Sequence, residues 1–585
     1  MSNKKNVRKQ NIVQLLLGLA IIILVNIIGQ YFFTRFDLTS EKKYTLSQST
    51  KELVKSFDDY VTFKVYLDGS FPAGFKKLQR ETREMLDEFH AYNSNINYEF
   101  INPNEVVEDK KNKNSFYAEL NRKGLDPTTI QSQDGARQSQ QVLFPGALVT
   151  YKANREEAIN LLESRMDASS EEQINESIQA LEYNLASALM KLKSAEKDKI
   201  AFLHGHGELP KANLDGAEKA LSEFYNIDHL ILENKVYSLL KRTEPDSAGN
   251  VHVYPRYKSL IIAQPTRAFT EKEKFFIDQY VMHGGKVMWL VDPVATSMDS
   301  LQAQSRTLAV PADLNLDDMF FRYGVRLNKN LIQDMRSAAI PVNTQPKGSK
   351  PKFKLFPWPY FPVISPNSNH PIVKNLNGIK GEFVSTLDTI SGNNVTKTML
   401  LKSSQYSRVL STPHAINLNI INRKPQRSQY NHGSQNIGVL LEGKFSSLFE
   451  NRIPPEIAQN KAMAFRTESE KNQMIVVADG NIIKNAISIK GGERKKLPLG
   501  VDKYTGQQYG NEDFIVNAVN YLCDDSGLLN VRTRDLKIRL MDRAKVQEER
   551  LKWQIINVVI PVLLILIMSV IWNIIRKRKY TRPGK

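Results

Sequence analysis

The sequence predicts an α/β protein that a helix at each end holds at a membrane. Three observations predict this class: an apolar run lies near each terminus, strands alternate with helices between the runs, and the strands of the second half are continuously apolar. Such strands are typical of a parallel sheet covered on both faces. We therefore expect a β-α-β, thioredoxin-like unit followed by a parallel-sheet domain, flavodoxin- or amidotransferase-like, with a β-rich insertion.

Two apolar runs, residues 12–33 and 553–575, are each long enough to cross a bilayer as a helix. A spanning helix needs roughly 20 mostly apolar residues, and neither run contains a charged side chain. A cleaved signal peptide is the alternative for the first run. Its apolar stretch is longer than a signal peptide requires, and no A-x-A-like cleavage site follows it. We expect an uncleaved anchor there and a second transmembrane helix near the other end.

Basic flanks predict how the two helices cross the membrane. Four Lys and Arg residues lie in the N-terminal segment 1–11, and six lie in the tail 576–585. Because Lys and Arg concentrate on the cytoplasmic side, we expect both termini in the cytoplasm and the long central region in the periplasm, at the cytoplasmic (inner) membrane. Asn26 and Asn557 are polar groups at bilayer depth, which favours contact with another helix.

The formal net charge of +18 does not indicate a nucleic-acid-binding protein. The N-terminal segment carries +4 and the tail +6, which leaves +8 spread over the central region without a Lys/Arg stripe. We expect the basic ends to contact anionic membrane lipid instead. Cys523 is the only cysteine, so the sequence excludes an internal disulfide and a Cys-rich metal site.

The first extracytoplasmic domain is expected over residues 34–197. Its expected elements are a helix capped by Ser47, a strand at 61–67, a helix at 75–89, strands at 96–101 and 147–151, and a long helix from 174 to 197. The first strand, the helix after it and the second strand form the predicted β-α-β unit.

The second extracytoplasmic domain is expected over residues 198–530, followed by a juxtamembrane segment at 531–552. Apolar strands are expected at 199–203, 260–263, 287–291 and 474–478, and helices at 217–224, 271–283 and 511–522. Strands and helices that alternate in this way predict a parallel sheet. A long insertion at about 311–470 precedes the last of these strands, and its own strands are placed only loosely.

Residues 341–371 hold eight prolines interleaved with aromatic side chains, among them Trp358, Tyr360 and Phe361. This density of proline excludes a regular helix and favours extended chain. One hypothesis is an exposed aromatic surface on which a partner docks. The alternative is a segment whose rings pack on their own domain, and the sequence does not separate the two.

The turn His204-Gly205-His206-Gly207-Glu208 follows the first strand of the predicted parallel sheet. Parallel α/β sheets bind ligands at the carboxyl ends of their strands, so His204, His206 and Glu208 are candidate ligand-binding residues. The same argument adds Asp292, which ends another strand, as does Asp479. A metal site is not expected, because the sequence has no H-E-x-x-H motif and its other histidines are scattered. In the structural alternative, the glycines make a tight turn and the carboxylates cap helices.

The sequence lacks the motifs of three enzyme classes. The P-loop requires G-x-x-x-x-G-K-[ST], and Gly285-Lys286 and Gly443-Lys444 are followed by Val287 and Phe445. The sequence also has no G-x-S-x-G elbow. An amidotransferase-like hydrolase needs a cysteine nucleophile after an early strand, and Cys523 lies much too late in the chain. We expect no catalytic activity and no cofactor.

Several motifs, in their order along the chain, resemble the gliding-motility ABC-transporter auxiliary family GldG. They are Arg35-x-Asp37-Leu38-Thr39 followed by Tyr44-Thr45-Leu46-Ser47, then Leu181-Glu182-Tyr183, the turn at 203–208 and Trp358-Pro359-Tyr360-Phe361-Pro362. The first of these and the turn also resemble a broader class of ABC-transporter auxiliary proteins. The resemblance implies a non-catalytic membrane subunit that works with a separate permease and a separate ATP-binding subunit in a gliding system.

Two other functions stay open at this point. A binding subunit would have a pocket for a small molecule or glycan above the ends of the strands at Leu203, Ala263 and Val291. A hydrolase would place an acid, a base and a nucleophile at the same edge of the sheet. The sequence disfavours the hydrolase, because only the turn at 203–208 offers such groups.

Overall fold

The computed structural model describes residues 13–24, 45–524 and 549–580. Gaps within the second range fall at 70, 107–109, 135–136, 153–154, 163–168, 194–196, 233–237, 245–251, 346–349, 351, 367–368, 393, 423–424, 455–463 and 491–492. The chain divides into two compact units, Met1–Arg534 and Asp535–Lys585. Asn26, Arg35, Asp37 and Tyr44 lie outside the described residues.

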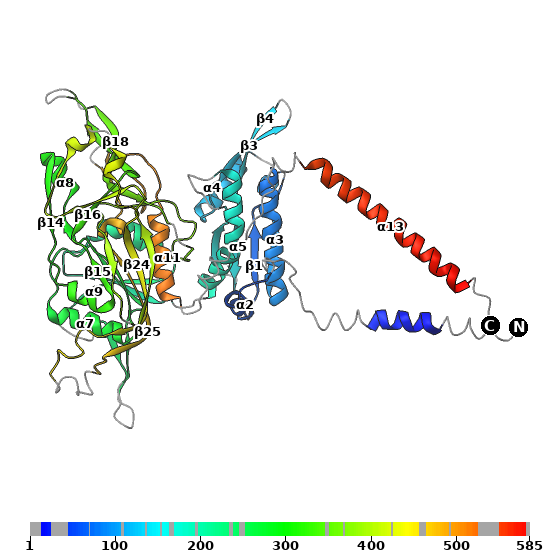
Figure 1. Ribbon diagram of the computed structural model, residues 1–585, viewed down its shortest axis with the longest axis horizontal. Helices are drawn as coiled ribbons and strands as arrows, with labels where there is room; N and C mark the ends of the chain where they lie inside the picture. Colours follow the sequence, from blue (N-terminus) through cyan, green and yellow to red (C-terminus); the bar gives the residue numbers. More distant parts are fainter. Residues whose placement is uncertain are drawn as a thin grey trace. The chain divides into compact units, whose positions relative to one another are not determined.

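A four-stranded sheet forms the N-terminal part of the first unit (Figure 1). β1 (Val61–Val65), α3 (Ala73–Tyr92) and β2 (Ile96–Phe100) are the predicted β-α-β unit, and β1 pairs with β2 in parallel. β5 (Gly146–Tyr151) and β6 (Arg155–Asn160) complete the order β2-β1-β5-β6 as antiparallel strands. The other elements here are α2 (Gln48–Lys55), α4 (Lys110–Arg122), β3 (Thr128–Asp134), β4 (Arg137–Leu143) and α5 (Ser170–Lys193).

Two predicted features of this domain are confirmed at the residue level. The hydroxyl of Ser47 accepts a hydrogen bond from the backbone N–H of Thr50, so Ser47 caps α2. The apolar face of the last helix, α5, is buried from Ile174 to Leu192. It packs against β1 and α3 in one apolar core, which the helical spacing of the sequence predicts.

A seven-stranded sheet forms the larger part of the first unit, in the order β21-β24-β25-β12-β11-β7-β8. Its five parallel strands are β7 (Lys199–His204), β8 (Asn226–Ile231), β11 (Ser259–Ala263), β12 (Lys286–Leu290) and β25 (Glu468–Val477). Numbered along the chain, their spatial order is 2-1-3-4-5, which is the flavodoxin-like order.

Helices cover both faces of this sheet (Figure 1). α7 (Glu271–Met282) and α9 (Asp317–Tyr323) pack with one core, which includes Trp289. α6 (Lys211–Ser222) and α11 (Asn511–Cys523) pack on the other face. Both faces of the parallel strands are therefore buried, which explains why these strands are continuously apolar.

The insertion between β12 and β25 contributes two strands to the main sheet itself. β21 (Val395–Lys402) and β24 (Asn436–Ser446) lie beyond β25 as antiparallel strands. Besides α9, the insertion contains the α-helix α8 (Met298–Gln304), and its other strands are β13 (Val294–Ala295), β14 (Arg306–Pro311), β15 (Val325–Leu327), β16 (Asn330–Asp334), β17 (Ser337–Asn343), β18 (Phe353–Ile364), β19 (Ile379–Lys380), β20 (Leu387–Thr389), β22 (Ser407–Ser411) and β23 (His414–Asn417). The insertion is therefore β-rich, as predicted.

The proline- and aromatic-rich segment forms most of β18, an extended strand paired with β17. Trp358, Tyr360 and Phe361 are 0%, 2% and 3% exposed and pack with Ile340 in a core of the insertion. These three rings thus pack on their own domain, as the second of the two alternatives has it. The start of β18 remains exposed.

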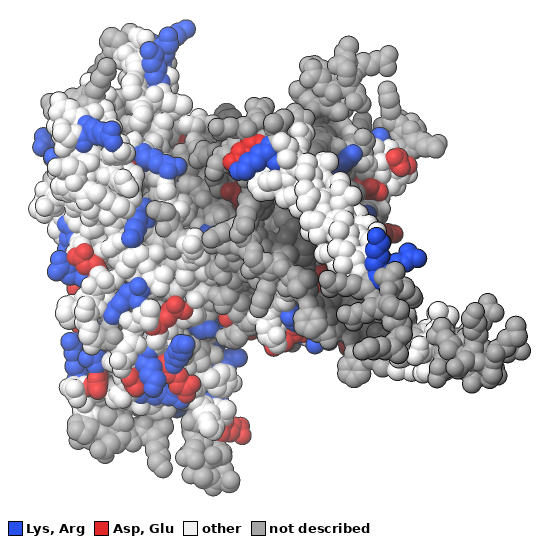
Figure 2. Space-filling model, turned by 45° about the vertical axis from the view of Figure 1, so that its right-hand side comes forward, with Lys and Arg blue, Asp and Glu red and all other residues white. Residues whose placement is uncertain are grey.

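The second unit is a single long helix over its described residues, α13 (Arg550–Tyr580). By length and composition its segment Lys552–Lys577 suffices to span a bilayer. Figure 2 shows this helix as a nearly continuous white surface that ends in Lys and Arg side chains. Asn557 is exposed on it. Near the N-terminus a shorter apolar helix, Val13–Leu24, is described, so the two-pass layout stays a prediction.

Candidate functional site

The carboxyl ends of β7, β11, β12 and β25 meet at one edge of the main sheet, because these four strands are parallel neighbours. Four groups of polar residues follow these ends: the turn at 203–208, Gln264, Asp292 and Asp479. This edge is where open α/β sheets bind ligands. It is therefore the candidate functional site.

Asp292 and Asp479 hold the loop after β25 from both sides. Asp292 accepts hydrogen bonds from the backbone N–H of Gly480 through Oδ1 at 2.5 Å and from Gln264 Nε2 through Oδ2 at 2.7 Å. Asp479 accepts from the backbone N–H groups of Asn481 at 2.8 Å and Glu382 at 3.1 Å. Asn481 Nδ2 lies 3.2 Å from Asp292 Oδ2, so Asn481 contacts one carboxyl group through its side chain and the other through its backbone.

Burial makes this pair hard to ionise. Asp479 is 0% exposed, and burial followed by the negative charge of Asp292 raises its pKa well above the usual range. Burial also raises the pKa of Asp292 to about 6, although the bonds from Gln264 and Gly480 oppose this. Burial and the mutual repulsion of the two carboxyl groups therefore favour the protonated form of the pair, which lies in a cluster of amide and backbone donors.

Gln264 occupies an unusual backbone conformation at the end of β11. Its φ is +57°, in the left-handed region that non-glycine residues seldom adopt. Gly480 lies against it so closely that a Cβ on Gly480 would stand 2.7 Å from the Cβ of Gln264. Strained residues of this kind cluster at functional sites, where the surrounding structure holds them in place. Sequence reasoning missed Gln264, because a glutamine after an apolar strand is a common turn residue.

A polar cleft of about 300 Å³ opens beside Asn481. It is lined by Phe361, Lys380, Glu382, Lys484 and Tyr504, among others. Lys380 Nζ lies 3.0 Å from Glu382 Oε1 and 3.0 Å from Asp502 Oδ2, and 5.2 Å from the ring centre of Phe361. Lys484 is exposed, and within the described part of the chain its ammonium group has no hydrogen bond or ion pair. The cleft thus offers charges of both signs beside aromatic rings.

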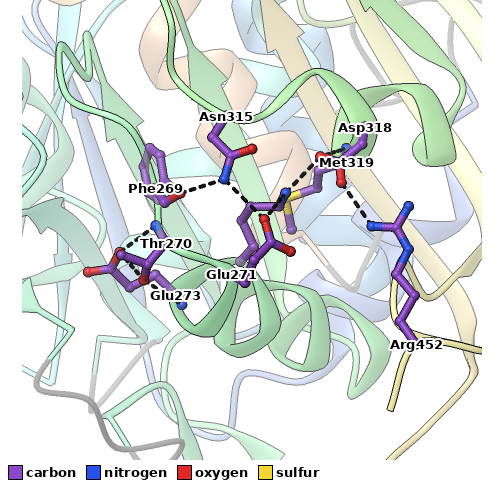
Figure 3. Close-up of polar contacts among 9 residues, drawn as sticks. Phe269, Thr270, Glu271, Glu273, Asn315, Asp318, Met319 and Arg452 are labelled. Carbon is purple, nitrogen blue, oxygen red and sulfur yellow. Dashed lines mark hydrogen bonds and ion pairs between the residues drawn. The ribbon is translucent and has the colours of Figure 1, made fainter.

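His206 and Glu208 are brought together, but inside the protein. His206 is 4% exposed, and its Nδ1 lies 3.2 Å from Glu208 Oε1. Its Nε2 lies 3.2 Å from Glu273 Oε1, and its ring stacks on Phe269 at 3.8 Å between centres. Figure 3 shows Phe269, Thr270 and Glu273 at the start of α7, where Thr270 and Glu273 form a capping box.

These contacts give His206 a structural role. Its backbone carbonyl also accepts hydrogen bonds from the N–H groups of Thr266 and Arg267, so it joins the loops after β7 and β11. Burial disfavours the imidazolium, but the two carboxylates outweigh this effect and hold the pKa of His206 above its usual value. The turn needs glycine at Gly207, whose φ is +74° and whose Cβ would stand 2.2 Å from Thr266 Oγ1.

His204 lies apart from the other predicted residues. Its Nε2 is 2.8 Å from Nδ1 of His229 on the edge strand β8, and burial lowers its pKa. Among the residues that the structure describes, no three His, Cys, Asp or Glu side chains are arranged to hold a metal ion. The lining of the cleft includes Phe361 but none of His204, His206, Glu208 and Asp292.

The fold and the C-terminal helix describe an α/β protein that associates with a membrane, and the comparisons with known proteins agree. The family described as "ABC-type uncharacterized transport system", an auxiliary domain family, matches residues 197–518. The chain belongs to this family, and it is therefore a transport-associated accessory protein. A second family, described only as a domain of unknown function, matches residues 40–150.

Two individual proteins are also similar to this chain. A Borreliella burgdorferi protein described as "Uncharacterized protein" is 21% identical over 99% of this chain and 100% of its own length. The solved structure described as "mmIFT52 N-terminal domain" covers 55% of this chain and 96% of that one, at 13% identity and a TM-score of 0.30. A TM-score this low supports no inference.

Proposed function

We propose that this chain is a non-catalytic, membrane-anchored auxiliary subunit of an ABC transporter complex. The observation that carries this proposal is the family match over residues 197–518, which is most of the main α/β domain. The chain has no P-loop motif in its sequence, so the energy for transport must come from a separate ATP-binding subunit. A separate permease would form the path through the bilayer.

The finer parts of the proposal rest on the sequence. The basic tail at 576–585 favours a cytoplasmic C-terminus, and the first apolar run favours a second anchor with the main domains in the periplasm. The motifs that resemble GldG connect the complex with gliding motility. In this arrangement the two helices pack against the permease, and Asn557 is a candidate contact.

Co-purification tests the proposal. The tagged chain is extracted from its own membranes in mild detergent, and the proteins that remain bound are identified by mass spectrometry. We expect one permease and one ATP-binding subunit. In the matched control, a plain leucine helix of equal length replaces residues 553–575, which keeps the anchor but removes specific helix packing. Recovery of neither subunit with the native chain would contradict the proposal.

A second candidate function is binding of a small molecule or glycan, and the cleft beside Asn481 favours it. Aromatic rings, amides and charged groups converge there at the edge of the sheet where ligands bind in such folds. Small molecules released from the purified chain would be identified by mass spectrometry. The variant Lys484→Ala should lose them, whereas Lys402→Ala, at an exposed lysine of β21, should keep them. If both variants release equal amounts of the small molecule, the cleft is not its binding site.

A further inference from the structure

The exposed end of the β17–β18 hairpin carries apolar side chains that are not buried in its own domain. Asn343 pairs with Phe353 and Pro341 with Leu355 across the two strands. Beyond them the N–H of Thr344 donates to the carbonyl of Lys352 at 2.9 Å, and the N–H of Lys352 donates to Asn343 Oδ1 at 3.0 Å. The ribbon therefore keeps its hydrogen bonds up to its last described residues. In Figure 1 β18 reaches one end of its domain.

Two apolar side chains stand out from this ribbon. Phe353 is 63% exposed and Leu355 is 50% exposed. They lie two residues apart on one strand and so share a face of the ribbon. Further along β18, Trp358 and Tyr360 are buried, so the domain completes its core without the two exposed residues.

Lysines alternate with these two side chains along the chain, so Lys354 lies on the opposite face of the strand. Lys350, Lys352 and Lys354 are exposed, and no described residue forms an ion pair with them. The sequence has no Asp or Glu between Asp334 and Glu382, so no acid in this segment offsets their charge. Exposed apolar side chains among lysines fit an anionic surface that is apolar beneath its charged layer.

We propose that the hairpin end, defined as Lys350 and residues 352–355, inserts into the interfacial region of an anionic lipid bilayer. Phe353 and Leu355 enter below the head groups, and the lysines contact lipid phosphates. A specific protein partner is a poorer fit, because such interfaces bury about 1,200–2,000 Å² and two side chains supply little of this. The proposal rests on the membrane anchoring that the proposed function includes. α13 keeps the chain at a bilayer, so a weak second contact with the same surface becomes effective.

Site-directed labelling of the full chain tests this contact. The variant Leu355→Cys is coupled to a fluorophore and reconstituted into vesicles of phosphatidylcholine, with or without phosphatidylglycerol. Cys523 is buried, and burial raises its pKa to about 12, so it stays unlabelled. The matched control is Phe321→Cys on α9, where the native side chain is 59% exposed. Lipids with a nitroxide on the head group quench a label that reaches the interface.

We expect quenching at position 355, but not at 321, in vesicles with phosphatidylglycerol. Replacing Lys352 and Lys354 by Ala should weaken the contact roughly thirtyfold, and Phe353→Ser should also reduce it. Equal quenching at both positions, no quenching at 355, or no dependence on phosphatidylglycerol would overturn the proposal. Quenching that requires added permease and ATP-binding subunits would overturn it in favour of a protein contact. Flotation of the chain with the vesicles tests the anchor separately, so a failed anchor and a failed hairpin contact are distinguishable.

Discussion

The buried carboxylate of Asp278 should be one of the strongest single contributions to the stability of the main domain. Asp278 lies on α7 and is 0% exposed. Its Oδ1 accepts hydrogen bonds from the hydroxyl of Tyr323 and the N–H of Leu448, both at 2.9 Å. Its Oδ2 accepts from Ser447 Oγ at 2.6 Å and from Gln279 Nε2 at 3.1 Å. One side chain thus joins α7 to α9 and to the chain after β24.

The variant Asp278→Ala should destabilise the domain by about 4 kcal/mol. It leaves the hydroxyls of Tyr323 and Ser447 and the N–H of Leu448 without their acceptor, at about 1–3 kcal/mol for each buried donor. Part of this cost is offset, because burial raises the pKa of Asp278 and shows that holding its charge inside the protein is unfavourable. Tyr323→Phe removes one donor and leaves the others satisfied, so it should cost only about 1 kcal/mol.

Thermal unfolding of the purified chain and amide hydrogen exchange at Leu448 measure these effects. A loss of about 4 kcal/mol speeds exchange at Leu448 roughly a thousandfold if its amide exchanges through opening of this domain. Tyr323→Phe is the matched control, with an acceleration of about fivefold. If the two variants destabilise equally, or if Asp278→Ala leaves the Leu448 amide protected, the four hydrogen bonds do not act as argued.

Three further predictions concern ionisable groups. The raised pKa values of Asp292 and Asp479 mean that the folded chain binds more protons than the unfolded chain. The stability of the fold, measured as its melting temperature, should therefore fall as the pH rises from about 4 to 7. The variant Asp479→Asn should show a smaller fall over the same range. The pKa of His206 is raised above 6.5 as well, so its contribution to stability is present at low pH and is lost as the pH rises above this value. His206→Gln should remove only that later decline, and a variant that keeps the decline would contradict the role of His206. Lys274 is 0% exposed and lies 2.8 Å from carboxylate oxygens of Glu271 and Asp318, which Figure 3 places with their neighbours. Lys274→Met should change the free energy of unfolding by less than about 1 kcal/mol. Asp318→Ala leaves the buried ammonium group with one partner fewer and should cost about 2 kcal/mol. A larger loss for Lys274→Met than for Asp318→Ala in thermal unfolding would refute this order.

Local sequence patterns predicted most of the regular elements. Ser47 caps its helix, and the β-α-β unit and four of the five parallel strands of the main sheet lie where the sequence places them. The strand β8 was missed, because it lies at the edge of the sheet, is mostly exposed or half-buried, and has no apolar run. The joining of β21 and β24 to the main sheet was also missed, since strand pairing depends on partners far away in the sequence.

The candidate site was predicted only in part. Asp292 and Asp479 are visible in the sequence as acids that end apolar strands, but their proximity depends on β12 and β25 being neighbours. Gln264 and Glu382 reach the same place from other segments, and no local pattern distinguishes them from ordinary turn residues. The turn at 203–208 was recognisable by its glycines. Its sequence does not show that His206 faces inward onto Phe269.

By itself the sequence determined where the chain is apolar enough to enter a bilayer, where its strands and helices alternate, and which transport-associated class its motifs resemble. These properties are local, because they depend on composition and on spacings within a few turns of chain. Only the tertiary structure decided that Trp358 is buried while Phe353 is exposed, and that two strand-end acids share one site. Burial and pKa depend on which distant segments pack together, and that packing is a property of the whole fold.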